Sequence, residues 1–161
     1  MRDMRSPLGR SYLVLALMLG GLLLACNRAG MPPVTPAVTL EVMGQEGWQA
    51  TGVQLKTDDR VTITYLSGLW QNNTAGRAVD ARGYAGEYPQ DIEGMCGEAP
   101  LPGVLNGALV GRIGEGPAFL IGNYLSFMAD RDGGLWLRMN DADACLNDNG
   151  GSLKVEVRQK H

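Results

Sequence analysis

A strict two-residue alternation of apolar and polar side chains flanks a short acidic segment near the C-terminus. The apolar positions are Leu135, Leu137 and Met139 before the segment, and Leu153, Val155 and Val157 after it. A period of two predicts β-strands with one buried face. The segment between them, residues 141–151 (DADACLNDNGG), is rich in side-chain oxygens and ends in two glycines that permit a sharp turn. The sequence therefore predicts a strand, an acidic loop and a second strand.

Other short strand-like segments precede this unit at fairly even spacing. We expect strands at residues 38–42, 51–55, 61–66, 108–113, 118–121 and 124–128. Turn-forming Gly, Pro and Asp residues separate most of them, and the 23 glycines and eight prolines of the chain disfavour helix. Such a pattern predicts an all-β fold, an antiparallel β-sandwich. Residues 71–103 differ, because they contain six glycines and no clear strand, and a segment of this length is often functional.

The first 25 residues are typical of a bacterial lipoprotein signal peptide. Three arginines, at positions 2, 5 and 10, precede an apolar run over residues 12–24 that is too short for a comfortable transmembrane helix. The run ends in LLAC, which resembles the lipobox, so we expect Cys26 to be acylated. The alternatives are an ordinary secretory leader with a chance cysteine, or an uncleaved anchor.

We expect residues 26–36 to form a flexible, proline-containing tether and residues 37–161 to form the folded domain. Asn27 follows the predicted lipidation site, and by resemblance to known sorting patterns this favours the outer membrane. The predicted location is thus the bacterial cell envelope, with attachment to the membrane through a lipid anchor.

Charge and histidine content exclude several classes of function. The chain has 17 acidic and 14 basic residues and a net charge of −3, with no basic patch, so we expect no nucleic-acid partner. Its only histidine is the terminal His161, which argues against histidine-based hydrolysis, histidine-bound zinc and imidazole acid–base catalysis. Glycosidases need a pair of carboxylates, and no pattern singles one out here. We therefore expect no enzymatic activity.

The acidic segment has the donor types of a calcium site. Asp141, Asp143, Asp148 and Asn149 bring carboxylate and amide oxygens close together, and Ca²⁺ takes six to eight such ligands. The segment is no EF-hand, because the sixth position counted from Asp141 is Leu146 instead of glycine. A solvated acidic loop that binds nothing remains the alternative, and for Asp143 we favour a role as a turn residue.

Four segments resemble the LecA (PA-IL-like) family of calcium-dependent, galactose-binding bacterial lectins. They are residues 59–63 (DRVTI), 107–114 (GALVGRIG), 135–141 (LWLRMND) and 148–157 (DNGGSLKVEV). The resemblance covers about residues 37–158, and it implies a jelly-roll, galactose-binding-domain-like sandwich with a lectin function.

This resemblance also implies a set of metal ligands. Asp141 would be the anchor ligand, Asp148 and Asn149 would add side-chain oxygens, and Cys145 a backbone carbonyl. A further carbonyl would come from the start of the long segment, near Asn72. The family has asparagine at the position of Asp148, so this site has one more negative charge, which should tighten Ca²⁺ binding.

The implied sugar contacts come from the same two regions. They are Tyr88, Asp91, Asp141, Ala142 and Asp148. Tyr88 stands where the family has a sugar-contacting histidine, so the expected ligand is galactose or a related glycan. Trp48, Trp70 and Trp136 could form a sugar platform, although a tryptophan beside a strand more often belongs to the core or the sheet surface. Trp70 opens the long segment and is the one expected nearest to this site. The alternative function is that of a structural or protein-binding envelope lipoprotein that keeps the sandwich without binding sugar.

Two cysteines remain once Cys26 is assigned to acylation. Cys96 lies in the long segment and Cys145 in the acidic loop, and two cysteines in an exported chain usually pair. A disulfide would hold the long segment over the acidic loop. Two unpaired thiols are the alternative, because sequence does not fix their separation.

Overall fold

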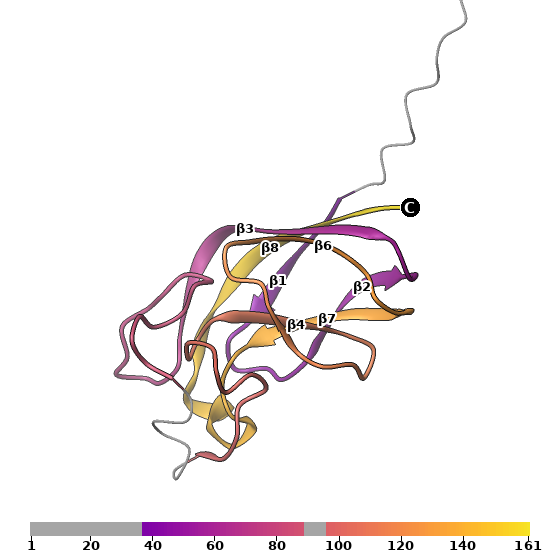
Figure 1. The fold of residues 1–161 in the computed structure, drawn as a ribbon. Helices are drawn as coiled ribbons and strands as arrows, with labels where there is room; N and C mark the ends of the chain where they lie inside the picture. The colour runs from indigo at the N-terminus through magenta and orange to yellow at the C-terminus, as the bar shows by residue number, and fades with distance from the viewer. Residues whose placement is uncertain (1–36, 89–95) are drawn as a thin grey trace, which may run out of the picture. The chain divides into compact units, whose positions relative to one another are not determined.

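Two four-stranded antiparallel sheets make up the domain in a computed structural model that describes residues 37–88 and 96–161 (Figure 1). The first sheet has the order β1-β8-β3-β6, with β1 at Val38–Met43, β8 at Gly150–Lys160, β3 at Arg60–Gln71 and β6 at Tyr124–Met128. The second has the order β2-β7-β4-β5, with β2 at Gln49–Leu55, β7 at Gly133–Met139, β4 at Leu109–Ile113 and β5 at Phe119–Leu120. The predicted all-β antiparallel sandwich is confirmed.

Apolar side chains from both sheets form a shared core. In β8 the buried residues Leu153, Val155 and Val157 alternate with more exposed neighbours, as the period of two predicts. Leu135 and Leu137 of β7 supply the same kind of inward face from the second sheet. Full burial of each such side chain contributes about 1.5–3 kcal/mol, so this alternation sets which face of each strand turns inward.

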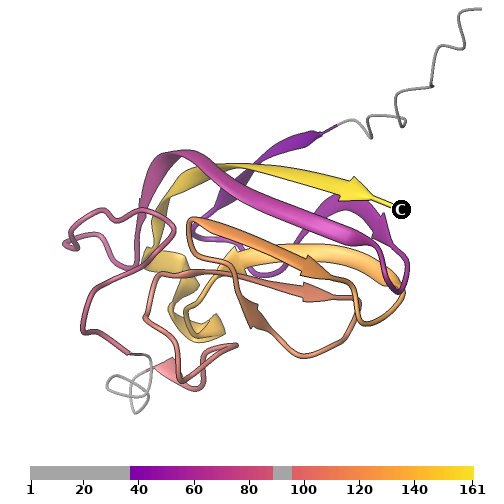
Figure 2. The same cartoon turned by 45° about the horizontal axis from the view of Figure 1, so that its top comes forward.

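Strand pairing brings the acidic loop and the segment after β3 to one end of the sandwich. The long β3–β8 ladder runs from Arg60 opposite Lys160 to Gln71 opposite Gly150. The segment that follows β3 therefore starts beside the end of the acidic loop. In the other sheet Met139 pairs with Leu109, which places the residues after β7 next to those before β4. Both views show these loops at the end of the strands opposite the C-terminus (Figures 1 and 2).

The strand bounds differ from the prediction chiefly in β3. This strand continues to Gln71 because a register shift between Tyr65 and Ser67 accommodates Gly68, which has a positive φ of 98°. A Cβ at position 68 would collide with the backbone of Ser152 in the neighbouring strand. Between β3 and β4 the described residues form no strand, only isolated bridges of Trp70 with Val79 and of Arg82 with Ala108.

The acidic loop contains a short helix that the sequence pattern did not predict. A 3₁₀ helix, η2, spans Asp143–Asp148 between β7 and β8. In the described part of the chain no helix has the length and apolar character needed to cross a membrane. The predicted signal peptide, the lipidation site Cys26 and the tether up to residue 36 lie outside the described residues, as does Asp91.

Candidate functional site

A pocket of about 350 Å³ lies where the acidic loop meets the long segment after β3. Its lining combines side-chain oxygens with two cysteines and an exposed tyrosine: Asn72, Asn73, Gly86, Glu87, Tyr88, Cys96, Asn106, Asp141, Cys145 and Asp148. Five residues predicted from the sequence for the metal or sugar site are among them. The fold thus brings together residues up to 76 positions apart in the chain, from Asn72 to Asp148.

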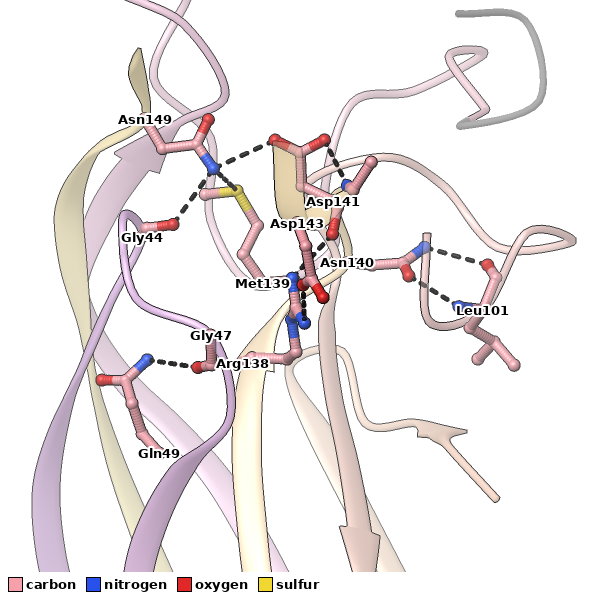
Figure 3. Close-up of polar contacts among 11 residues, drawn as sticks. Gly44, Gly47, Gln49, Leu101, Arg138, Met139, Asn140, Asp141, Asp143 and Asn149 are labelled. Atoms are coloured by element: carbon pink, nitrogen blue, oxygen red, sulfur yellow. Dashed lines mark hydrogen bonds and ion pairs between the residues drawn. The ribbon is translucent and has the colours of Figure 1, made fainter. Parts of the chain in front are cut away.

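Asp141 is the most buried acidic group of this pocket, with 1% of its surface exposed. Its Oδ1 accepts a hydrogen bond from the Ala142 backbone N–H at 2.8 Å, and its Oδ2 accepts one from the Asn149 amide at 3.0 Å (Figure 3). Burial raises the pKa of Asp141 and nearby Asp148 raises it further, whereas these two hydrogen bonds oppose the rise. A buried carboxylate of this kind is stabilised by a bound cation.

Two buried amide oxygens at the site have no hydrogen-bond partner among the described residues. The Asn149 amide nitrogen donates to Gly44 O at 3.1 Å, to Met139 Sδ at 3.4 Å and to Asp141, which leaves its Oδ1 unpaired. The second oxygen is Oδ1 of Asn106, a residue only 2% exposed that lines the pocket. A buried acceptor without a partner costs about 1–3 kcal/mol, and a cation beside it would remove that cost.

Asn106 was not predicted from the sequence. The sequence offered one signal for a role in the site: Asn106 is a polar residue directly before the GALVGRIG strand, whose start is buried. Asparagine is common in turns, and only tertiary packing shows that this side chain is buried without a partner.

The donor set fits a hard divalent cation such as Ca²⁺. The described residues contain no cluster of three or more His, Cys, Asp and Glu side chains that could hold a metal ion. A site here would therefore combine the carboxylates of Asp141 and Asp148 with amide and backbone oxygens, the mixture that Ca²⁺ takes in proteins. Zinc and copper prefer nitrogen and sulfur donors, which this pocket does not offer, because both of its cysteines are in a disulfide.

Arg138 holds the acidic loop in position from its buried side. The side chain is 2% exposed, and it donates from Nε to Met139 O at 3.0 Å and from Nη2 to Asp141 O at 2.8 Å. Its Nη1 forms an ion pair with Asp143 Oδ1 at 2.6 Å (Figure 3). Asp143 therefore serves the loop structure, as the turn interpretation favoured, and it does not line the pocket.

Asn140 plays the matching role for the long segment. Its Oδ1 accepts from the Leu101 backbone N–H at 3.0 Å, and its amide nitrogen donates to the carbonyls of Leu101, Val104 and Leu105. Arg138 and Asn140 stand at the polar positions of the alternation that ends at β7, where a solvent-facing side chain is the ordinary expectation. Both are buried instead, because loops cover that face at this end of the sheet.

Cys96 and Cys145 form a disulfide, which confirms the predicted pairing. Their Cα atoms are 5.4 Å apart, and both residues line the pocket. The bond joins the long segment covalently to η2.

The remaining predicted residues take different positions. Tyr88 lines the pocket and is 37% exposed, whereas Ala142 is buried outside the lining. The Asn72 backbone N–H donates to the Tyr84 hydroxyl at 3.0 Å, and the Asn72 side-chain oxygen accepts from the Asn73 amide nitrogen. Asn72 would therefore reach a metal through its backbone carbonyl. Trp70 is fully buried and donates from Nε1 to Gly107 O at 2.7 Å, so it belongs to the core and offers no face to a ligand.

Comparison with known proteins shows which solved structures have a similar fold. No protein-family model matches the chain, and neither does any curated protein. Among solved structures it is similar to the EclA N-terminal domain, described as a PllA-like lectin, with a TM-score of 0.58 and 24% sequence identity. The match covers 76% of this chain and 95% of that one. The fold is lectin-like. This likeness supports the broad prediction of a lectin-like sandwich and does not single out the LecA family.

Proposed function

We propose that this domain binds a carbohydrate, galactose or a related glycan, through a Ca²⁺ ion held by the acidic loop. The observation that carries the proposal is the pocket itself, where the buried Asp141 carboxylate lies with the partnerless amide oxygens of Asn106 and Asn149 close by. The lectin-like fold supports a carbohydrate as the ligand.

Side-chain oxygens of Asp141, Asp148 and Asn149 would hold the ion, and backbone carbonyls of Cys145 and Asn72 would complete the protein's share. Asn106 joins this set through its partnerless Oδ1. A bound Ca²⁺ supplies open coordination positions for two neighbouring sugar hydroxyls.

Tyr88, exposed at the pocket, would stack on the apolar face of the sugar and form a hydrogen bond through its hydroxyl. Asp141 and Asp148 would also contact the coordinated hydroxyls, with Ala142 and Asp91 as further predicted contacts. Because few atoms engage the sugar, we expect an affinity in the range of about 1 μM to 1 mM for a single site.

Isothermal titration calorimetry with Ca²⁺ tests the metal site. We expect a binding isotherm for the wild-type protein and its loss in Asp141→Asn. The matched control is Asp132→Asn, which removes an exposed carboxylate in the turn between β6 and β7, and which should titrate like the wild type. Equal titrations of all three proteins would contradict a calcium site at Asp141.

A glycan array probed in Ca²⁺ and again with excess chelator tests the sugar. Binding that chelator abolishes supports the proposal. A blank array in Ca²⁺ would leave the alternative, a structural or protein-binding envelope protein built on the same sandwich.

We further propose that the protein is a lipoprotein of the bacterial cell envelope, attached through acylated Cys26 and sorted to the outer membrane. The basic, apolar leader that ends in LLAC supports this. Labelled palmitate should be incorporated into the wild-type protein and absent from Cys26→Ser, and membrane fractionation should place the wild type in the outer membrane. Label in the Cys26→Ser protein would argue against lipidation at this residue.

A further inference from the structure

The part of the proposed carbohydrate pocket that the structure describes is lined by acidic side chains and by no basic ones. Glu87, Asp141 and Asp148 contribute carboxylates, whereas Lys and Arg are absent from the described lining. Arg138 contacts the loop from behind, but it is 2% exposed and its charge is paired with Asp143. Any ligand that enters the pocket therefore meets negative charge.

Glu87 has a fixed backbone and an exposed side chain. Its N–H donates to Tyr84 O at 3.1 Å, and its carbonyl accepts from the N–H of Asn106 at 2.8 Å. The side chain is exposed and forms no ion pair within the described residues. Asn106, whose N–H binds this carbonyl, has a buried amide oxygen with no partner among the described residues, so the part of the pocket beside Glu87 also has a free acceptor for a bound ion.

A divalent cation would offset two of the three carboxylates. Asp141 and Asp148 both lie in the acidic loop and are the predicted ligands, so their charges are the ones that the ion neutralises. Glu87 comes from the long segment between β3 and β4 and is not among the predicted ligands, so its charge would remain.

We infer that the site distinguishes carbohydrates by charge, with Glu87 as the specificity-determining residue. It accepts neutral sugars, favours sugars with a free amino group, and rejects carboxylated sugars such as uronic acids. This inference rests on the proposed function, because it describes which carbohydrates the calcium site takes.

The expected discrimination is modest, because Glu87 is exposed to water. An ammonium group near an exposed carboxylate gains up to about fivefold in affinity, and a sugar carboxylate loses by a similar factor. Both effects should weaken as salt rises, since the Debye length falls from about 10 Å at 0.1 M to about 3 Å at 1 M.

Competition titrations of the full protein in Ca²⁺ test this inference, with D-galactose, D-galactosamine and D-galacturonic acid as probes. For the wild type we expect galactosamine to bind more tightly than galactose, by up to about fivefold, and galacturonic acid to bind several-fold more weakly than galactose. In Glu87→Gln the three affinities should converge, while Ca²⁺ affinity changes little. Glu115→Gln is the control, because this exposed carboxylate lies in the turn at the far end of β4 and should leave the ranking unchanged.

The outcomes separate the inference from the function on which it rests. Galacturonic acid binding as tightly as galactose, or an unchanged ranking in Glu87→Gln, would overturn the charge selection and leave the calcium-dependent site intact. Failure of all three sugars, together with a blank glycan array, would overturn both.

Discussion

Arg138 shows how a single buried cation organises the candidate site. It donates to the carbonyl of Asp141 and pairs with Asp143, so it fixes both ends of the turn that carries the predicted metal ligand. Its guanidinium also lies 5.5 Å from the ring centre of Trp48, which packs on its outer side. A residue that touches no ligand thus determines where Asp141 lies.

Arg138→Met is expected to destabilise the fold through the loss of these hydrogen bonds. The Asp141 carbonyl would stay buried without this donor, which costs about 1–3 kcal/mol. Asp143→Asn should cost less than about 1 kcal/mol, because asparagine keeps an acceptor oxygen and the side chain is 84% exposed. Urea denaturation of both variants measures the difference. Equal losses would show that Arg138 does not support the loop as described.

The residue types of the site were predictable where a sequence pattern marks them. Asp141, Cys145 and Asp148 follow from the strand–acidic loop–strand pattern and the family resemblance, and the structure places all three at one pocket. The roles of Asn106 and Arg138 were not predicted, because they depend on contacts between loops that are far apart in the sequence. Trp70 is fully buried in the core, the position that a tryptophan beside a strand most often takes.

At the scale of elements, the strands were predictable and the loop conformations were not. Seven of the eight strands start within two residues of the expected position, and the eighth, β8, starts three residues early because Gly150 and Gly151 pair with the end of β3. The helix η2 has no apolar periodicity of its own, with Leu146 as its one buried residue. It forms in a short loop that Arg138 holds at its start and that the disulfide ties near its middle.

The disulfide between Cys96 and Cys145 should be a major stabiliser of this end of the sandwich. It closes a loop with a sequence separation of 49 residues, for which the loss of unfolded-state entropy corresponds to about 4 kcal/mol. The double variant Cys96→Ser, Cys145→Ser should lose about this much in urea denaturation, and it should also bind Ca²⁺ more weakly, because η2 loses its tie to the long segment. Unchanged stability and unchanged Ca²⁺ binding would show that the bond is dispensable.

A second link between elements lies at the other end of the sandwich and should respond to pH. Asp132, in the turn between β6 and β7, accepts hydrogen bonds from Lys56 Nζ and from the Thr57 N–H, each at 2.8 Å. These contacts, with that of the Thr57 hydroxyl, lower the pKa of Asp132 from 3.8 to about 2. Because the folded-state pKa of Asp132 lies below its ordinary value, the stabilisation is fully present above about pH 3.8 and is lost as the pH falls through about 2.

The variant Asp132→Asn tests this pH dependence. It should be less stable than the wild type near neutral pH, and the gap should close on acidification toward about pH 2. Urea denaturation of both proteins across this range measures the gap. A gap that stays constant down to the lowest pH would contradict the ionised carboxylate as its source.

At the scale of the whole molecule, the hydrophobic core and the candidate pocket occupy different parts of the sandwich. The core lies between the sheets, where alternating side chains from both meet. The pocket lies at one end, built by loops that long-range strand pairing brings together and that Asn140, Arg138 and the disulfide tie to one another. This end has a buried carboxylate and two buried amide oxygens with no partner among the described residues, so it should be the part of the fold that gains most from a bound cation.

Ca²⁺ should therefore raise the melting temperature of the whole domain. A ligand that binds only the folded state adds about 2.7 kcal/mol at a concentration of 100 times its dissociation constant, which corresponds to a rise of about 10 °C for a domain of this size. Differential scanning calorimetry with increasing Ca²⁺ measures the shift. Asp141→Asn should show no such rise, and Mg²⁺ should give a smaller one, because it demands a tighter octahedral geometry than a loop of mixed oxygens provides. A melting temperature that stays constant over a thousandfold range of Ca²⁺ would show that the buried Asp141 carboxylate and its amide neighbours are stabilised by some means other than this ion.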